Sequence, residues 1–510
     1  MLAPLSENSD TTGWEGGVPA SEERRAGRAV IWNGVQKVLS KGLYLLGTLV
    51  LGRLLTPQDF GLVAIAAVAV TTAMGATETG MTQAIVQSSV RDDAHYDLAW
   101  TINALRGVLV CVTLMLAAPL IARLFDDPHA VPAIRLLALV PFIASIASPR
   151  LADLIRELNF SRLAVIGIGT VIVELGVSIS LAATFGGIAI ILGKISGAVM
   201  LSGASYVVAP HRPRLRLRHS AGQHLIAFGR WMFAIALLAV TSDLILKVLI
   251  STRLGVAPLG LFSLADKLAE TPNQLANEAI GSVAMPLYTQ LRTDQGRLTA
   301  ALRSHITALM CLLLPATALL VALAGPLEQR VLGPAWAGTS PMVILLAVGY
   351  LFELLFQAIV PLLTAQGAVS RLFLVDLLQY IVLIGSMALF AGPFGLVAAG
   401  IARILASLVV VAAGVAVAPP IFAPIAPQLI RSGVILGALA ALAGAAAGYS
   451  AQLIPGAIGV VCGAGVGAAL FLSSAWLSDS ALKIGIRECL GTFFPILAPR
   501  PRAAPSLDAP

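Results

Sequence analysis

The sequence predicts an all-helical, polytopic membrane protein with about fourteen transmembrane helices. The chain of 510 residues is 58% hydrophobic and 12% charged, with a mean hydropathy of +0.89. Soluble domains carry about 25% charged residues, so this composition indicates a membrane protein. Its apolar residues gather in runs of about 20, which is the length of a spanning helix and not of a membrane β-strand.

The predicted helices divide the whole chain into short connections and long apolar segments. The fourth is short and carries Arg135, and the eighth contains Asp266, Lys267, Glu270, Pro272 and Asn273. We expect the spans near residues 29–51, 60–82, 98–122, 131–149, 162–183, 186–208, 225–250, 258–281, 300–323, 339–363, 371–391, 394–418, 430–450 and 454–477.

The connections and tails set the expected domain boundaries. Residues 1–26 are polar, of mixed charge and without an apolar core, which predicts a disordered cytoplasmic tail and not a signal peptide. The remaining segments are 27–209 (N-lobe, spans one to six), 210–224 (basic cytoplasmic linker), 225–418 (C-lobe, spans seven to twelve), 419–478 (the last two spans) and 479–510 (cytoplasmic tail with a short interfacial helix).

Lysine and arginine gather in alternate connections. One side of the membrane receives about five times as many of them as the other, which predicts that both termini are cytoplasmic. The basic linker segment from His211 to His219 is read as part of this anchoring, in contact with anionic headgroups. Because the charge is spread in this way, the net charge of +7 does not indicate a nucleic-acid partner.

An internal repeat relates the two lobes. Arg53-Leu54 with Phe60 and Gly61-Leu62 is echoed by Arg253-Leu254 with Gly260-Leu261 and Phe262, at an offset of about 200 residues and six helices. An even number of spans per repeat gives both halves the same orientation in the membrane. In the last two spans, Gly444-x-x-x-Gly448 and Gly463-x-x-x-Gly467 predict close helix–helix contacts.

Soluble-enzyme and metal signatures are not found in the sequence. The four cysteines and six histidines are scattered and have no ligand spacing, so we expect no metal and no cofactor. There is no Gly-x-x-x-x-Gly-Lys-Ser/Thr loop for ATP, no His-Glu-x-x-His and no Gly-x-Ser-x-Gly elbow. We therefore expect that the protein is not an enzyme.

The first span carries a polar stripe. Asn33, Lys37, Lys41, Tyr44 and Thr48 recur at spacings of three and four, so they share one helix face. A lysine at the centre of a spanning helix costs roughly 2.5–3.5 kcal/mol on insertion scales. The stripe is therefore expected to face water or an anion, and we interpret it as the wall of a cationic cavity.

Ionisable residues within the predicted spans are the candidates for a substrate-binding or ion-binding role. The basic ones are Lys37, Lys41, Arg106, Arg135, Lys194, Lys247, Lys267 and Arg403, and the acidic ones are Glu78, Glu174, Asp243, Asp266, Glu270, Glu278, Glu353 and Asp376. Such groups mark substrate or ion paths, but each has a structural alternative. Lys247 can pair with Asp243 one turn away, and Lys267 with Glu270; the single residues Glu174, Lys194, Glu353 and Asp376 can form packing pairs, and Arg106 can snorkel.

Several stretches resemble one family of transporters. They are Arg53-Leu-Leu-Thr-Pro-Gln-Asp-Phe-Gly-Leu62, Asp243 to Gly255, Leu259 to Lys267, Met285-Pro-Leu-Tyr288 and Leu332-Gly-Pro-Ala-Trp336. Over residues 25–420 the chain is similar to the polysaccharide transporter (Wzx-like) branch of the multidrug/oligosaccharidyl-lipid/polysaccharide (MOP) flippase superfamily. The chain departs from the family at Lys247, where apolar residues or glycine are common, and this puts a transferred role for Asp243 in doubt.

The resemblance implies two six-helix lobes around a central cavity that opens alternately to either side. The implied activity is translocation of an undecaprenyl-diphosphate-linked oligosaccharide across the bacterial inner membrane, for exopolysaccharide, capsule or O-antigen (lipopolysaccharide) synthesis. Expected partners are this lipid-linked oligosaccharide, the bilayer, a coupling proton or sodium ion and the polysaccharide polymerase and export machinery. The expected roles are diphosphate binding (Lys37, Lys41, Arg106, Lys247 and Lys267), sugar contact (Asn33, Gln36, Tyr44 and Gln274) and ion coupling (Glu78, Asp243, Asp266 and Glu353).

Two other functions remain open. A drug/cation antiporter of the same superfamily would favour acidic residues in its cavity, whereas the first helix here is basic. A membrane glycan polymerase or ligase would normally present a large outer loop, whereas the outer connections here are about fifteen residues at most.

Overall fold

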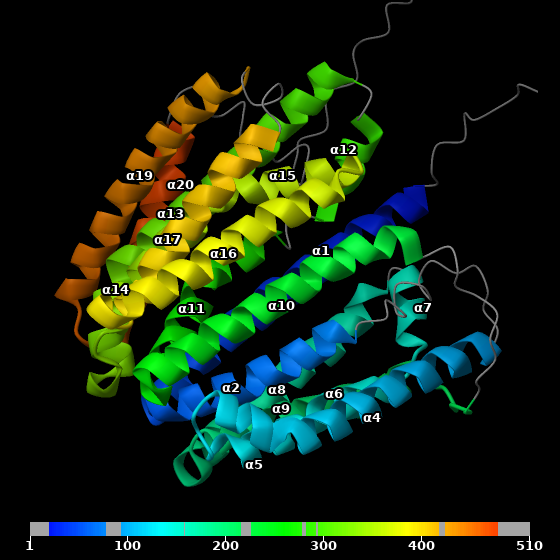
Figure 1. Cartoon of the computed structure of the whole chain (residues 1–510). Coiled ribbons are helices and arrows are strands. Elements are labelled where there is room, and N and C mark those ends of the chain that lie inside the picture. The colour runs from blue at the N-terminus through cyan, green and yellow to red at the C-terminus, as the bar shows by residue number, and fades with distance from the viewer. Residues whose placement is uncertain are drawn as a thin grey trace, which may run out of the picture.

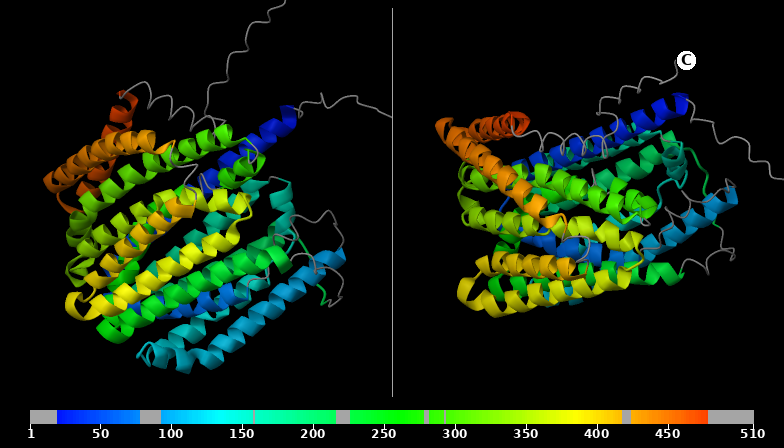
Figure 2. Two further views of the ribbon diagram at one scale, coloured as in Figure 1. Left: turned by 45° about the horizontal axis from the view of Figure 1, so that its top comes forward. Right: turned by 90° about the horizontal axis from the view of Figure 1, so that it is seen from above.

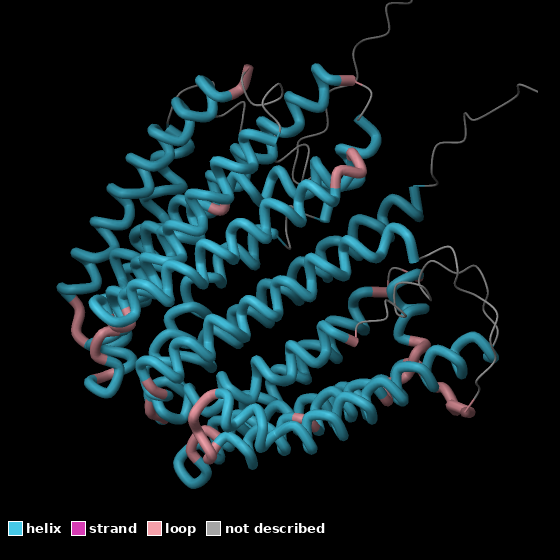
Figure 3. Tube along the Cα trace, in the orientation of Figure 1, coloured by secondary structure: helices cyan, strands magenta, loops and turns pink. Residues whose placement is uncertain are grey.

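The computed structural model is helical throughout its described part, which comprises residues 20–77, 93–157, 159–215, 226–277, 282–291, 294–417 and 424–477. Within these ranges every regular element is a helix and none is a strand (Figure 3). The predicted fold class is confirmed. The predicted N-terminal tail up to residue 19, linker residues 216–224, Glu78 and the interfacial helix after residue 478 lie outside the described ranges.

Eleven segments of the described chain are long and apolar enough to cross a membrane. They are α2 (Pro57–Ala76), α4 (Asp93–Leu124), α8 (Phe160–Phe185), α9 (Ile188–Val208), α10 (Ile226–Leu254), α13 (Gln295–Pro326), α14 (Thr339–Phe352) continued by α15 (Leu354–Ala365), α16 (Val369–Phe394), α17 (Val397–Val417), α19 (Ala426–Leu453) and α20 (Gly456–Leu477).

Three further segments complete the predicted set and differ from these eleven for identifiable reasons. α1 (Ala20–Leu54) carries the two lysines and begins before its expected start at residue 29. The fourth segment is broken into α5 (Ala130–Leu137) and α6 (Leu139–Ser145), and α11 (Val256–Ala276) holds the charges of the eighth span. Shorter elements are α7 (Leu151–Arg156), α12 (Ser282–Leu291), η3 (Leu327–Leu332) and η4 (Pro334–Trp336).

The repeat appears in the helix turns of the two halves, α1–α9 and α10–α17. α8 ends at Gly186 with φ +56°, and α16 ends at Gly395 with φ +55°, each leading directly into the next helix. Both positions require a residue that tolerates positive φ, which is why glycine occupies them. In Figure 1 the first half lies below and to the right, the second half above and to the left, and α1 and α10 run between them.

The last two helices pack on the outside of the second half, along α13 (Figures 1 and 2). A Cβ at Gly444 or Gly448 would press on α13 at Ala318 or Ala322. Gly463 and Gly467 of α20 pack in the same way against α19. The predicted close approach through small residues is therefore confirmed.

The bundle has two ends, which we call the hairpin end and the linker end. The hairpin end holds the α1–α2 and α10–α11 connections together with η3 and η4. There Thr56 caps α2, whose Asp59 also accepts a hydrogen bond of 2.7 Å from the amide of Gly187. The linker end holds residues 209–215, where Asp97 of α4 accepts a bond of 3.0 Å from the amide of Arg214.

Candidate functional site

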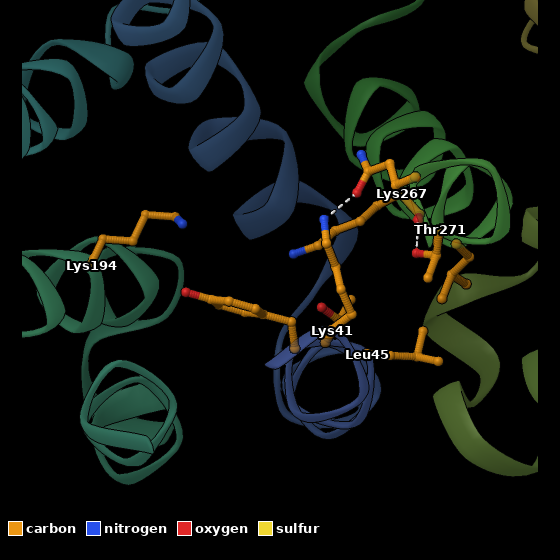
Figure 4. Close-up of a pocket in the computed structure, with 9 residues that line it drawn as sticks. Lys41, Leu45, Lys194, Lys267 and Thr271 are labelled. Carbon is orange, nitrogen blue, oxygen red and sulfur yellow. Dashed lines mark hydrogen bonds between the residues drawn. The ribbon is translucent and has the colours of Figure 1, made fainter. Parts of the chain in front are cut away.

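A cavity of about 240 Å³ lies between α1, α9 and α11, so both halves of the chain contribute to it. Figure 4 shows Lys41, Lys194 and Lys267 on three different helices around this space. The lining residues are Lys41, Tyr44, Leu45 and Thr48 from α1, Lys194 from α9, and Lys267, Leu268, Thr271 and Gln274 from α11.

Lys41 connects the two halves. Its ammonium donates a hydrogen bond of 2.6 Å to Oε1 of Gln274, a residue 233 positions away (Figure 4). The side chain of Gln274 also hydrogen-bonds Glu270, one turn earlier on α11. The amide thus holds the ammonium at the wall of the cavity without neutralising its charge.

Glu174 anchors two groups that line the cavity. This carboxylate on α8 is buried. Its Oε2 accepts a hydrogen bond of 2.7 Å from the Tyr44 hydroxyl, and its Oε1 accepts one of 3.1 Å from the Lys194 ammonium. A hydrogen bond to an ionised acceptor is stronger than one between neutral groups, so α1 is tied firmly to the α8–α9 pair.

Lys267 approaches the same space from α11. Its ammonium lies 6.0 Å from the centroid of the Tyr44 ring, within the range of a cation–π contact between the halves. Glu270, the partner predicted from the sequence, hydrogen-bonds Gln274. Lys267 itself is exposed, and its ammonium is available to a ligand in the cavity.

The charge around the cavity is positive. Among its lining residues are three lysines and no carboxylate, and Glu174 behind the wall offsets one of the three. At an effective dielectric constant of about 20, two unit charges about 5 Å apart interact by roughly 3 kcal/mol. An anion placed among the lysines would therefore be attracted strongly, and an organic cation repelled.

Other residues of the predicted site on α1 lie elsewhere. Lys37 is partly buried one turn before Lys41 and is not among the lining residues. Gln36 packs against α8, where its amide occupies the space that a Cβ at Gly167 would need. Asn33 lies on α1, but its side chain is outside the described part.

Two of the predicted diphosphate ligands are engaged away from the cavity. Lys247 donates a hydrogen bond of 2.7 Å to Asp243, one turn earlier on α10. The intrahelical pair that was expected as an alternative is therefore present. Arg106 of α4 donates a hydrogen bond of 3.5 Å to the carbonyl oxygen of Thr77, just beyond the end of α2. Neither Lys247 nor Arg106 is among the lining residues.

Two of the four acidic residues expected to couple an ion, Asp266 and Glu353, belong to a polar network in the second half. Asp243 pairs with Lys247, and Glu78 lies outside the described residues. Asp266 accepts a hydrogen bond of 2.8 Å from the hydroxyl of Tyr350. Oε1 of Glu353 accepts hydrogen bonds from Arg403, Ser407 and Gln379 at 2.9–3.3 Å. The Arg403 guanidinium also donates a hydrogen bond of 2.6 Å to the Tyr350 hydroxyl, and its Cζ lies 4.3 Å from the centroid of the Tyr350 ring.

Lys194 and Glu174 were not predicted to belong to the site. A signal existed, since both lie near the middle of consecutive spans, and adjacent antiparallel helices bring their midpoints together. Thr48 belongs to the polar stripe predicted to line the cavity, and it does line it. Thr271 was not predicted, because serine and threonine are common in spanning helices.

Comparison with known proteins places these features in a family. The profile of the family described as polysaccharide biosynthesis protein matches residues 50–341. The chain is similar to the succinoglycan biosynthesis transport protein ExoT of Rhizobium meliloti, with 26% identity over 72% of this chain and 75% of that protein. It is also similar to the lipopolysaccharide biosynthesis protein WzxC of Escherichia coli, with 24% identity over 67% and 70% of the two chains.

Solved structures share the fold. The lipid II flippase MurJ in an inward closed conformation superposes with a TM-score of 0.64 over 88% of this chain and 98% of that one, at 13% identity. An inward-facing multidrug resistance MATE family transporter of the MOP superfamily follows with a TM-score of 0.54 over 76% and 95%, at 14% identity.

Proposed function

Because the chain belongs to the polysaccharide biosynthesis protein family, we propose that it is a flippase for an undecaprenyl-diphosphate-linked oligosaccharide. The protein is a multi-pass membrane transporter of polysaccharide biosynthesis. In the proposal it lies in the bacterial inner membrane with both termini cytoplasmic, which the arginine bias of the connections supports. The product serves exopolysaccharide, capsule or lipopolysaccharide assembly by separate polymerase and export proteins.

The observation that carries the proposal is the cluster of Lys41, Lys194 and Lys267 around one cavity shared by both halves. The diphosphate of such a lipid carries about two negative charges, which cannot enter hydrocarbon alone. The lysines replace water around these charges as mobile point donors. We keep Lys37 as a candidate for the path that leads to the cavity, and we leave Lys247 and Arg106 out of the diphosphate site.

The rest of the substrate has a place in the same scheme. Sugars meet the hydroxyls of Tyr44, Thr48 and Thr271 and the amide of Gln274, while the polyprenyl tail remains in the bilayer. Translocation is then a rocking of one half against the other, with no bond chemistry. Binding of the diphosphate favours the rocking because it removes repulsion between Lys41 and Lys267, which lie on opposite halves.

A coupling ion would act through the second half. Asp266 and Glu353 are held in the network around Arg403 and Tyr350, next to α11, which also bears Lys267. Uptake of a proton or sodium ion there changes the charge on the helix that contacts the substrate. Asp243 and Glu78 remain further candidates for this role.

Reconstitution in vesicles tests the proposal. Purified protein is placed in liposomes with a fluorescent undecaprenyl-diphosphate oligosaccharide, and the label on the outer leaflet is followed by quenching. We expect the parent to flip the lipid and Lys41→Gln/Lys267→Gln to lose at least about tenfold in rate, which corresponds to roughly 1.4 kcal/mol. Lys41→Arg/Lys267→Arg should retain flipping, since the positive charge is kept.

The control variant is Arg123→Gln, which removes one positive charge from the exposed end of α4 and leaves the cavity lysines in place. A parent protein that moves a cationic dye but not the lipid would instead identify a drug/cation antiporter. Formation of longer glycans in the vesicles would identify a polymerase or ligase. Full flipping by the double glutamine variant would refute the cationic site.

A further inference from the structure

The two copies of the repeat motif touch each other across the halves. A Cβ at Gly61 of α2 would overlap the carbonyl oxygen of Val256 at the start of α11. A Cβ at Gly260 of α11 would overlap the carbonyl oxygen of Pro57 at the start of α2. Because each glycine contacts the first turn of the other helix, the contact is reciprocal, as at a two-fold axis.

This contact is between backbones. At both sites the obstacle to a Cβ is a carbonyl oxygen of a helix, which cannot swing aside as the end of a side chain can. Glycine at these two positions therefore sets how closely α2 and α11 approach at the hairpin end. The conformation itself does not require glycine, because neither residue has a positive φ.

Trp336 of η4 covers the crossing from the second half. The side chain is fully buried, and its indole N–H donates a hydrogen bond of 2.6 Å to the carbonyl oxygen of Gly52 in the last turn of α1. Its ring meets Phe60 of α2 edge-on, with centroids 5.0 Å apart. Carbonyls in the last turn of a helix have no intrahelical donor, so water can replace the indole when the halves part.

Two other hydrogen bonds join the halves at this end and have the same character. Ser251 of α10 donates 2.7 Å to the carbonyl oxygen of Phe125, which follows α4. Arg53 at the end of α1 donates 3.4 Å to the carbonyl oxygen of Leu332 in η3. In both, a side chain from one half meets a carbonyl at a helix end of the other, and water can satisfy either partner after separation.

We propose that the Gly61–Gly260 crossing with Trp336 is the gate that closes the cavity from the hairpin end, and that both glycines are required for it to close. The inference rests on the proposed flippase function for its role in transport, but not for its structure. Thr48, which lines the cavity, lies only one helical turn from Gly52, so separation of the crossing would expose the cavity wall directly.

A cysteine reporter tests the gate without any substrate. Thr48→Cys is introduced into the full chain, and a membrane-impermeant maleimide is added to one side of sealed vesicles of either orientation. Labelling of His129→Cys, an exposed position beside Phe125, identifies the side on which the hairpin end lies. The chain without the reporter gives the background from the native cysteines.

We expect slow labelling of the reporter from the hairpin side in the parent and a rate about tenfold or more higher in Gly61→Ala and in Gly260→Ala. Gly176→Ala is the matched control, because a Cβ at this α8 position meets no atom within 4 Å; its rate should equal that of the parent. Trp336→Phe keeps an aromatic ring but loses the N–H donor, and should also raise the rate.

Unchanged labelling in the two glycine variants, at normal amounts in the membrane, would overturn the gate. If neither glycine variant reaches the membrane, Trp336→Phe decides in the same assay, since a phenyl ring fits the space of the indole. Failure of the lipid-flipping assay with the expected labelling pattern would refute the flippase function and leave the gate in place.

Discussion

The hydroxyl of Tyr44 donates a hydrogen bond of 2.7 Å to Glu174, and the other oxygen of this carboxylate holds the ammonium of Lys194 at 3.1 Å. One buried acid therefore positions a neutral and a charged group of the cavity wall. It also sets the total charge there, because three lysines line the cavity and Glu174 offsets one of them. We expect a cavity that binds a diphosphate well enough to accept it and weakly enough to release it.

Glu174→Gln should upset this balance. The amide still accepts from Tyr44, but Lys194 loses its counter-charge, so the cavity becomes more positive. We expect the KM for the lipid-linked diphosphate to fall by about tenfold and the flipping rate at saturation to fall as release slows, for an added interaction of roughly 1–2 kcal/mol. Initial flipping rates against substrate concentration measure both. Glu157→Gln, at an exposed position, is the charge-matched control; a rise in KM for Glu174→Gln would contradict the electrostatic account.

Arg403→Met should destabilise the second half. The guanidinium donates to Tyr350 and Glu353, and its removal leaves the Glu353 carboxylate without a positive partner. Breaking a fully buried pair in this way costs about 3–5 kcal/mol. Because the Arg403 and Glu353 side chains are each 17% exposed, we expect a smaller loss, seen as a fall in the apparent Tm in a detergent melt followed by tryptophan fluorescence.

The double variant Glu353→Gln/Arg403→Met separates charge from packing. It removes both partners, and it should recover a large part of the lost Tm because no unpaired charge remains. A single Arg403→Met variant that melts with the parent would argue that the network contributes nothing to stability.

Asp97→Ala should free the segment that follows α9. Asp97 is buried and accepts two hydrogen bonds, one of 3.0 Å from the backbone amide of Arg214 and one of 3.1 Å from Nε2 of His211. Because proteolysis requires local opening, we expect trypsin to cut after Arg214 about tenfold faster, as read by mass spectrometry of the fragments. Asp93→Ala removes an exposed carboxylate from the same helix and should leave the rate unchanged; equal rates in both variants would show that Asp97 does not hold the segment.

Gly444→Leu should weaken the attachment of α19 and α20. The new side chain would press on the α13 backbone at Ala318, and overpacking of this kind costs about 1–3 kcal/mol. The apparent Tm should therefore drop, while flipping per folded molecule persists because neither helix lines the cavity. Gly437→Leu, where a Cβ meets no atom within 4 Å, should be close to neutral; a comparable loss in both variants would refute the packing argument.

Local geometry could be read from the sequence. Asp243 and Lys247 are one turn apart on one helix, so helix geometry alone made their pairing possible. This pair was expected only as the alternative to a place for Lys247 in the diphosphate site, and the structure shows the pair. The small-residue spacing at Gly444 and Gly448 likewise predicted a close contact. The repeat around Gly61 and Gly260 was recognised as well, but its alignment could not reveal that the two copies touch.

Contacts between distant helices were not readable. Lys41 meets Gln274 across 233 positions, and Lys267 approaches the ring of Tyr44 on the first helix. Each depends on how far a helix is rotated about its own axis and along which neighbour it lies. The stripe on α1 showed that Asn33, Gln36, Lys37 and Lys41 lie on or near one face, but not that Gln36 would pack against Gly167 while Lys41 reached the cavity.

The sequence by itself determined the helical membrane class, the number and order of the spans and the two-fold repeat. It could do so because hydrocarbon admits only backbone that is hydrogen-bonded within its own segment, and this requirement is written in runs of apolar residues. Only the tertiary structure decided which charges line the cavity and which are paired, and that Gly61 and Gly260 close one end. Those outcomes depend on helix rotation and packing, which are set by contacts among all the helices together.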